Sequence, residues 1–199
     1  MKSSTFKIAF IGTHGVGKTT LCYGLAARLK AADFPLEVVG EVARRCPLPI
    51  NHETTLDAQS WILHTQIAEE IVAANRGRVV ICDRSVLDNF VYLLIASGSM
   101  RPPELETLIA AWTSSYDLLV RVPILENPSP DGLRATDPAF QKAVHERLER
   151  EIAQRQLEVV DLTGLEREQW LDHVERAALK KLQPAQMRLI DPSPLHSSP

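Results

Sequence analysis

A pattern typical of phosphate binding lies near the start of the chain. Residues 12–19 read GTHGVGKT, which has the glycine, lysine and hydroxyl spacing of phosphate-binding loops. Glycines let the backbone curl so that successive N–H groups point at phosphate oxygens, and the following helix presents the positive end of its dipole. We expect this loop to bind a nucleotide through Gly12, Thr13, His14, Gly15, Val16, Gly17, Lys18, Thr19 and Thr20.

Two side chains of the loop have distinct chemistry. Lys18 is expected to reach the β- and γ-phosphates of ATP, and the Thr19 hydroxyl is placed to bind Mg²⁺, which prefers hard oxygen ligands. The competing interpretation is a chance glycine-rich turn. The eight-position match, between an apolar run and a helical pattern, argues against chance.

An acid follows a second apolar run. Residues 79–82, VVIC, lead directly into Asp83, the order expected of a Walker B strand whose carboxylate lies beside the phosphate loop. Asp83 can hold Mg²⁺ through water or accept the proton of an attacking hydroxyl, and Arg84 can neutralise the transferring phosphate. The alternative makes Asp83 a helix N-cap and Arg84 a surface cation.

Alternating strands and helices must position these residues. Short apolar runs predict strands at 7–11, 36–39, 78–82, 118–122 and 157–162. Helical spacing of apolar residues predicts helices over 18–33, 54–76 (with Thr54 and Asp57 as a capping box), 87–95, 102–112, 140–152 and 171–182. The strands are continuously apolar, so both of their faces should be buried. The sequence therefore predicts an α/β, three-layer fold: a five-stranded parallel sheet with helices on both faces.

Length and composition fit one folded domain. The 199 residues are 45% hydrophobic and 24% charged, which excludes disordered and fibrous classes of protein. We expect the domain to span 1–183. The letters NPSPDG break regular structure, so a lid is predicted at 126–137, and the Pro/Ser-rich residues 184–199 are predicted to be a flexible tail.

Charge and hydropathy limit the partners. A net charge of −3 disfavours nucleic acids and anionic membranes, and the apolar runs are too short for a signal peptide or a membrane span. The cysteines are Cys22, Cys46 and Cys82, without a Cys/His cluster, which disfavours a disulfide framework and zinc. We therefore expect a cytoplasmic protein with a small-molecule partner; the oligomeric state stays open, a homodimer included.

The combined motifs resemble a known family. The phosphate loop, residues 83–85 (DRS) and residues 131–134 (DGLR) resemble the P-loop nucleoside and nucleotide kinases. The similarity is greatest to AAA-type ATP-binding proteins related to the ribosylnicotinamide kinase domain of the bacterial NAD-biosynthesis regulator. In deoxynucleoside and thymidylate kinases, an acid-Arg-Ser or acid-Arg-Tyr step likewise ends the third strand. The resemblance covers 7–162 in element order and implies a P-loop NTPase fold that uses ATP and Mg²⁺.

The acceptor side has its own candidates. Glu41 follows the second strand at the carboxyl edge of the sheet, where open α/β folds bind ligands. The resembling kinases place an acid there to meet the acceptor hydroxyl, so Glu41 is a second candidate base beside Asp83. Arg44 could hold a phosphate or carboxylate of the acceptor, unless this segment is a solvated charged turn. Gln59, Trp61 and Gln66 could line the acceptor site, although the helical spacing of Trp61 favours packing in the core.

The resemblance also implies a lid arginine and an adenine contact. Arg134 would act as an internal arginine finger, with Arg147 and Arg150 as alternates. A plain Asp-Gly turn with a solvated arginine would give the same letters. Residues 161–164, DLTG, close the last strand, where nucleotide kinases contact adenine through backbone atoms.

The leading hypothesis is a kinase that moves the γ-phosphate of ATP to a hydroxyl or phosphate of a nucleoside or nucleotide. The rival is an ATPase or a regulatory nucleotide-binding module. AAA machines normally follow the Walker B acid with a glutamate that activates water; Arg84 occupies that position here, which favours transfer over hydrolysis. A GTPase lacks support because no N-K-x-D segment is present, and the acidic balance disfavours a polynucleotide kinase.

Overall fold

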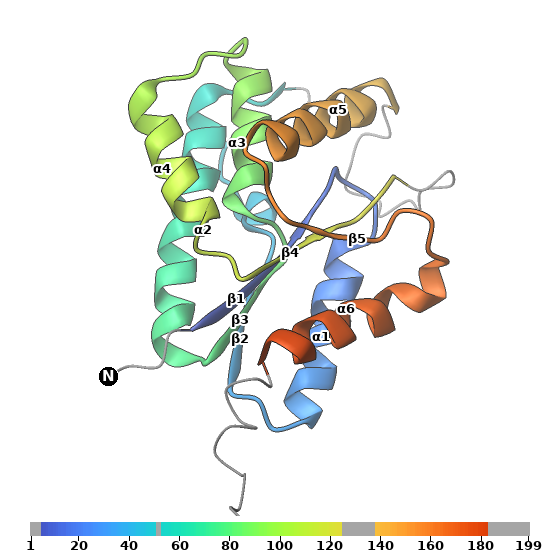
Figure 1. The fold of residues 1–199 in the computed structure, drawn as a ribbon. Helices are drawn as coiled ribbons and strands as arrows, with labels where there is room; N and C mark the ends of the chain where they lie inside the picture. The colour runs from blue at the N-terminus through green and yellow to red at the C-terminus, as the bar shows by residue number, and fades with distance from the viewer. Residues whose placement is uncertain (1–4, 51–52, 125–137, 183–199) are drawn as a thin grey trace, which may run out of the picture.

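A five-stranded parallel sheet runs through the middle of the molecule (Figure 1). In spatial order its strands are β2 (Leu36–Val39), β3 (Val79–Cys82), β1 (Phe6–Ile11), β4 (Leu118–Arg121) and β5 (Val160–Asp161). This computed structural model describes residues 5–50, 53–124 and 138–182. The chain passes from β1 outward to β2 on one side, and from β3 across β1 to β4 on the other. Ligand crevices of open α/β sheets form at the carboxyl ends of strands where the order reverses in this way.

Helices cover both faces of the sheet, as predicted. On one face lie α1 (Lys18–Ala31) and α6 (Arg167–Leu182); on the other lie α2 (Leu56–Arg76), α3 (Val86–Ala96), α4 (Pro103–Thr113) and α5 (Pro138–Gln154) (Figure 1). A short 3₁₀ helix, η1 (Val42–Arg45), follows β2. The three-layer α/β fold predicted from the sequence is confirmed.

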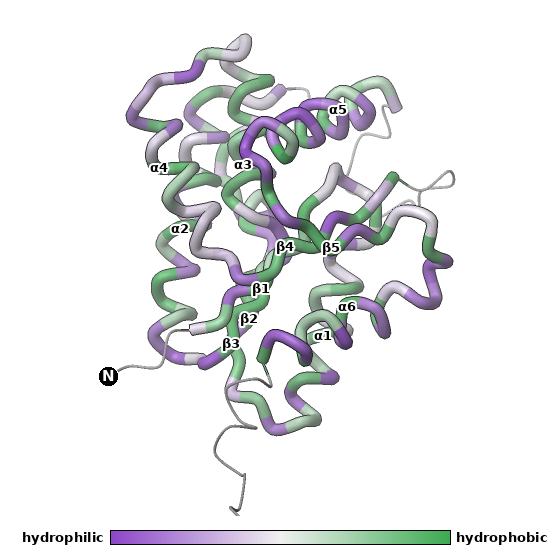
Figure 2. Tube along the Cα trace, in the orientation of Figure 1, coloured by the Kyte–Doolittle hydropathy of each residue, from purple (hydrophilic) through white to green (hydrophobic). Residues whose placement is uncertain are grey.

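Successive residues of a strand pack into two separate apolar layers, one on each face of the sheet. Ile8 and Phe10 pack toward α1 and α6, whereas Ala9 and Ile11 pack toward α2, α3 and α5. All four side chains are fully buried, and every residue of β3 is buried as well. Figure 2 shows mostly hydrophobic strands between helices in which hydrophobic and hydrophilic residues alternate. The continuous apolar strands thus serve two cores at once.

Some predicted boundaries differ from the structure. The last strand has only two residues, Val160–Asp161, because β4 pairs with no more of this segment. The N-cap of α2 is Thr55, whose side chain accepts a hydrogen bond of 3.1 Å from the backbone N–H of Ala58, so the capping box predicted for Thr54 and Asp57 is wrong. The predicted lid at 126–137 and tail at 184–199 lie outside the described residues, and the domain division stays a prediction. In the described part of the chain, no helix is both long and apolar enough to cross a membrane.

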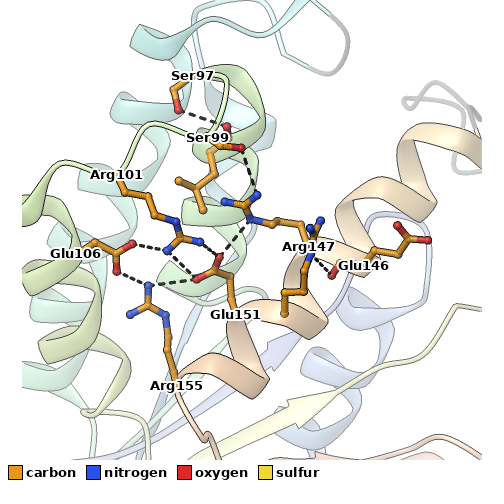
Figure 3. Close-up of polar contacts among 10 residues, drawn as sticks. Ser97, Ser99, Arg101, Glu106, Glu146, Arg147, Glu151 and Arg155 are labelled. Carbon is orange, nitrogen blue, oxygen red and sulfur yellow. Dashed lines mark hydrogen bonds and ion pairs between the residues drawn. The ribbon is translucent and has the colours of Figure 1, made fainter.

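A buried ion cluster joins α5 to α4 and to the segment between α3 and α4, on one side of the sheet (Figure 3). Glu151 of α5 is fully buried and contacts three guanidinium groups, those of Arg101, Arg147 and Arg155. Glu106 of α4 bridges Arg101 at 2.5 Å and Arg155 at 2.6 Å. The three arginines offset the cost of burying this carboxylate, and losing the carboxylate alone would leave its cations without a partner.

We predict that Glu151→Gln lowers the free energy of unfolding by about 2–4 kcal/mol, because three arginines lose their buried anion. Urea unfolding followed by circular dichroism measures this change. Lys142→Gln is the control, since Lys142 and Glu146 form an exposed pair 3.9 Å apart whose loss costs less than about 0.5 kcal/mol. Equal unfolding midpoints for both variants would refute a stabilising role of the cluster.

Candidate functional site

The phosphate loop has the backbone shape that its glycines predict. Gly12, Gly15 and Gly17 have φ angles of +149°, +74° and +95°, in the region that side chains disfavour. A Cβ on Gly12 would lie 2.7 Å from the carbonyl oxygen of Val122, so no larger residue fits there. Helix α1 begins immediately after Gly17. The loop and the helix N-terminus together can receive a phosphate group.

Lys18 is held inside the curl of the loop. Its Nζ donates hydrogen bonds to the carbonyl oxygens of Gly12, at 2.7 Å, and Thr13, at 2.5 Å. Burial, and then the positive charge of Arg84, lower the pKa of Lys18 to about 7. The charged and neutral forms of this amine are therefore close in free energy near neutral pH.

Asp83 lies opposite the loop. Parallel pairing of β1 with β3 brings the ends of both strands to one edge, and the Thr19 hydroxyl donates to Asp83 Oδ2 at 2.7 Å. Burial raises the pKa of Asp83, although the Thr19 hydrogen bond and the Lys18 charge oppose this shift. No group of three or more His, Cys, Asp or Glu side chains could hold a metal within 5–50, 53–124 and 138–182. Mg²⁺ at nucleotides needs only one or two protein oxygens beside phosphates and water, so the Thr19 and Asp83 oxygens fit it.

The start of α3 is tied to the same loop. Ser85 is the N-cap, and its side chain and that of Asp88 form a reciprocal capping box. Asp88 also accepts a hydrogen bond of 2.9 Å from the backbone N–H of Gly12. Arg84 is only 5% exposed. The alternative in which Asp83 caps the helix and Arg84 is a surface cation is therefore wrong.

Glu41 is held between two arginines. Its Oε1 accepts from Arg84 Nε at 2.9 Å and its Oε2 from Arg44 Nε at 2.8 Å. The Arg84 guanidinium lies 5.3 Å from the ring centre of Tyr92. Burial opposes the charged form of Arg84, but Glu41 and the other acidic groups around it together outweigh burial, and the pKa of Arg84 is raised. Glu41 is buried and the Arg44 side chain is 41% exposed, so the solvated-turn interpretation fails for Glu41.

Two cavities meet at Glu41 and Arg44. The first, about 150 Å³, is called the phosphate cavity and is lined by residues 15–20, Asp83 and Arg167 besides these two. The second, about 140 Å³, is called the side cavity; its further walls are His14, Ala43, Ile50, Gln59, Ile62, Arg84, Asn89 and Tyr92. Because the two cavities share Glu41, ligands bound in each would approach one another at its carboxylate.

The side cavity contains two unsatisfied hydrogen-bond donors. Arg84 Nη1 and Asn89 Nδ2 are buried and have no hydrogen-bond partner among the described residues. Leaving a buried donor without an acceptor costs free energy, more so for a charged group. Both residues line the side cavity, so a bound ligand whose acceptors reached these two groups would remove that cost.

The other predicted residues are more widely distributed. Gln59 lines the side cavity. Gln66 is not among the residues that line it, but donates a hydrogen bond of 3.3 Å to the carbonyl oxygen of Arg84. Trp61 is half-buried and lines neither cavity. Arg147 belongs to the ion cluster around Glu151, and Arg150 is exposed and donates to the backbone of Glu146. Arg134 lies outside the described residues. Asp161 accepts from Arg121 Nε, at 3.0 Å, and from the backbone N–H of Thr163, at 2.9 Å.

Sequence reasoning missed four polar or aromatic residues of the site. Asp88 could have been found from the Ser-x-x-Asp spacing of a capping box. Asn89 and Tyr92 follow on the same helix, and Arg167 reaches the phosphate cavity from the start of α6. No local pattern marks these three, because only the tertiary fold brings them to the loop.

Comparison with known families matches most of the chain. A family model described as an AAA domain matches residues 7–169. The chain belongs to this AAA-domain family. The search of curated proteins gave no significant match.

Solved structures share the fold. NadR protein in complex with NR is 21% identical with a TM-score of 0.64, and the match covers 97% of this chain and 54% of that one. NadR protein in complex with NAD and AMP-PNP is 18% identical with a TM-score of 0.63, covering 97% and 52%. Deoxyadenosine kinase from M. mycoides with bound dATP is 16% identical with a TM-score of 0.59, covering 87% and 98%. The chain thus has a P-loop kinase-like fold and spans about half the length of the NadR chains.

We predict that Lys18 takes up a proton when MgATP binds at pH 8.5. With a pKa of about 7 the free amine is mostly neutral at that pH, and the phosphate charge favours its protonated form. Titration calorimetry in buffers of different ionisation enthalpy should show uptake approaching about one proton per nucleotide. Lys18→Arg should bind without this uptake, because the guanidinium stays charged. Identical uptake by both proteins would mean that another group takes the proton.

Proposed function

We propose that the protein is an ATP- and Mg²⁺-dependent kinase that transfers the γ-phosphate to a hydroxyl or phosphate of a nucleoside or nucleotide. One observation carries the proposal: a phosphate-binding cavity and a second cavity meet at a buried carboxylate, Glu41. Phosphoryl transfer needs two adjoining sites, whereas hydrolysis needs only one site and water.

In this proposal, residues of the phosphate cavity hold the donor. The loop N–H groups and Lys18 bind the phosphates, and Arg167 adds a second cation at the start of α6. Thr19 and Asp83 would hold Mg²⁺, which when bound neutralises charge on the phosphates. Asp83 therefore serves as the metal anchor.

Glu41 serves as the base. It lies in the wall that both cavities share, whereas Asp83 lines only the phosphate cavity and is bonded to Thr19. Glu41 accepts the proton of the acceptor hydroxyl while the oxygen of that hydroxyl bonds to the γ-phosphorus. The bond from that phosphorus to the bridging oxygen of ADP breaks at the same time. Arg84 and Arg44 keep the carboxylate oriented. When the acceptor is a phosphate, the same two arginines can bind its charge.

The side cavity suits a planar acceptor with polar edges. Ile50, Ile62 and Tyr92 provide apolar and aromatic surface, and Arg84 Nη1 and Asn89 Nδ2 offer donors without partners. A nucleoside has both properties, with ring faces that pack and oxygens or ring nitrogens that accept hydrogen bonds. NadR in complex with NR and the deoxyadenosine kinase share this fold, which supports the same substrate class here.

The decisive test measures ADP formation from MgATP, alone and with a panel of nucleosides and nucleoside monophosphates that includes nicotinamide riboside and thymidylate. We expect acceptor-dependent ADP and a phosphorylated product identified by mass spectrometry. ADP release that is indifferent to every acceptor would instead establish the rival function, an ATPase or regulatory module.

Variants should separate the roles of the two carboxylates. We predict that Glu41→Gln lowers kcat by about 10²–10⁴-fold while MgATP affinity stays unchanged, because the base is lost and the phosphate loop and Lys18 are not altered. Asp83→Asn should raise the Mg²⁺ concentration needed for half-maximal rate. Arg45→Gln, in η1 but paired at the surface with Glu69, is the control and should keep the wild-type rate. If Asp83→Asn lost kcat alone and Glu41→Gln did not, the two assignments would be reversed.

A further inference from the structure

A buried carboxylate lies beneath the turn that follows β3. Glu70 of α2 is 1% exposed and accepts four hydrogen bonds. Its Oε2 accepts from Lys7 Nζ at 3.1 Å and Trp112 Nε1 at 2.7 Å, and its Oε1 from the Tyr116 hydroxyl at 2.6 Å and Gln66 Nε2 at 2.9 Å. The donors come from β1, α4, the segment before β4 and α2. Four donors on one buried carboxylate fix the positions of all their side chains.

Two of these donors also form hydrogen bonds with the backbone of the turn between β3 and α3. The Tyr116 hydroxyl accepts the N–H of Val86 at 3.0 Å, and Gln66 Nε2 also donates to the carbonyl oxygen of Arg84 at 3.3 Å. Burial and the neighbouring Glu70 raise the pKa of Tyr116 well above its usual range, so the hydroxyl keeps the proton that it donates. Lys7 and Trp112 bond to the other oxygen of Glu70, and none of the side-chain hydrogen bonds in the described structure joins them to this turn.

Stability alone does not account for such an arrangement. Apolar side chains of similar volume can often replace a buried ion network at no cost in stability. The network also fixes the orientation of the turn. Its hydrogen bonds hold the carbonyl of Arg84 and the N–H of Val86, which lie on either side of Ser85. The Asp83 side chain leaves this turn toward the phosphate cavity and the Arg84 side chain toward the side cavity.

We propose that Glu70 is a positioning residue for phosphoryl transfer, which acts through Tyr116 and Gln66 on the turn that carries Asp83 and Arg84. The inference rests on the proposed kinase function. A displacement of about 1 Å at reacting groups can cost about 10²-fold in rate, so loosening this turn should slow transfer without removing any group that touches substrate.

Two aromatic substitutions form a matched pair. Tyr116→Phe and Trp112→Phe each remove one hydrogen bond to Glu70, but only Tyr116→Phe disconnects Val86. We expect Tyr116→Phe to lower kcat by about 10- to 100-fold with an unchanged MgATP dissociation constant, and Trp112→Phe to keep kcat within about twofold of wild type. Equal losses of kcat in both variants, after correction for the folded fraction, would overturn the proposal.

A second readout does not depend on activity. Amide hydrogen exchange by NMR should be at least about tenfold faster at Val86 in Tyr116→Phe, because its N–H loses its acceptor, and unchanged in Trp112→Phe. Unchanged exchange at Val86 in Tyr116→Phe would also overturn the proposal. If the wild-type protein phosphorylated no acceptor, the kinase assignment would fail, and the exchange data would still show whether the Tyr116 hydroxyl, which donates to Glu70, holds the turn at Val86.

A further variant covers the case in which Tyr116→Phe does not fold. Gln66→Leu removes the other link, to the carbonyl of Arg84, at a side chain whose Oε1 already has no hydrogen-bond partner among the described residues. It should lower kcat in the same selective way, and a wild-type kcat would contradict the proposal.

Discussion

Parallel pairing between β1 and β3 is the constraint on which the site depends. The register Ala9–Cys82 brings the two strand ends to one edge, so the phosphate loop and Asp83 emerge side by side. Two side-chain bonds then join them, one from Thr19 to Asp83 and one from the N–H of Gly12 to Asp88. The glycine backbone, the metal ligands and the start of α3 are therefore fixed together rather than separately.

Charge is balanced across the interior of the site. Lys18 and Arg84 are buried beside Asp83 and Glu41, and each charge has an opposite neighbour that lowers the cost of its burial. Burial still shifts the pKa values of Lys18 and Asp83 toward their neutral forms. By contrast, the combined attraction of Glu41 and the other acidic groups nearby keeps Arg84 charged, which makes it a constant cation of the side cavity.

The sequence predicted what depends on local chemistry. Glycine spacing identified the phosphate loop, and apolar runs located every strand, although β5 is shorter than the run at 157–162 because only Val160 and Asp161 pair with β4. The N-cap of α2 was placed at the wrong one of two adjacent threonines, Thr54 in place of Thr55, because either hydroxyl can cap a helix. Asn89, Arg167 and three of the four donors of Glu70, namely Lys7, Trp112 and Tyr116, could not be predicted, because their roles depend on elements that meet only in the folded chain.

The two cavities have largely separate walls. The phosphate cavity is built from the loop, Asp83 and Arg167, whereas α2 and α3 contribute Gln59, Ile62 and Asn89 to the side cavity. In evolutionary terms this part of the site is modular: substitutions at these three positions can reshape the side cavity while the phosphate loop and its contact with Asp88 stay intact. One scaffold can thereby diversify its choice of ligand through a few side chains, with Glu41 and Arg44 as the shared positions that limit how far the two halves can drift apart.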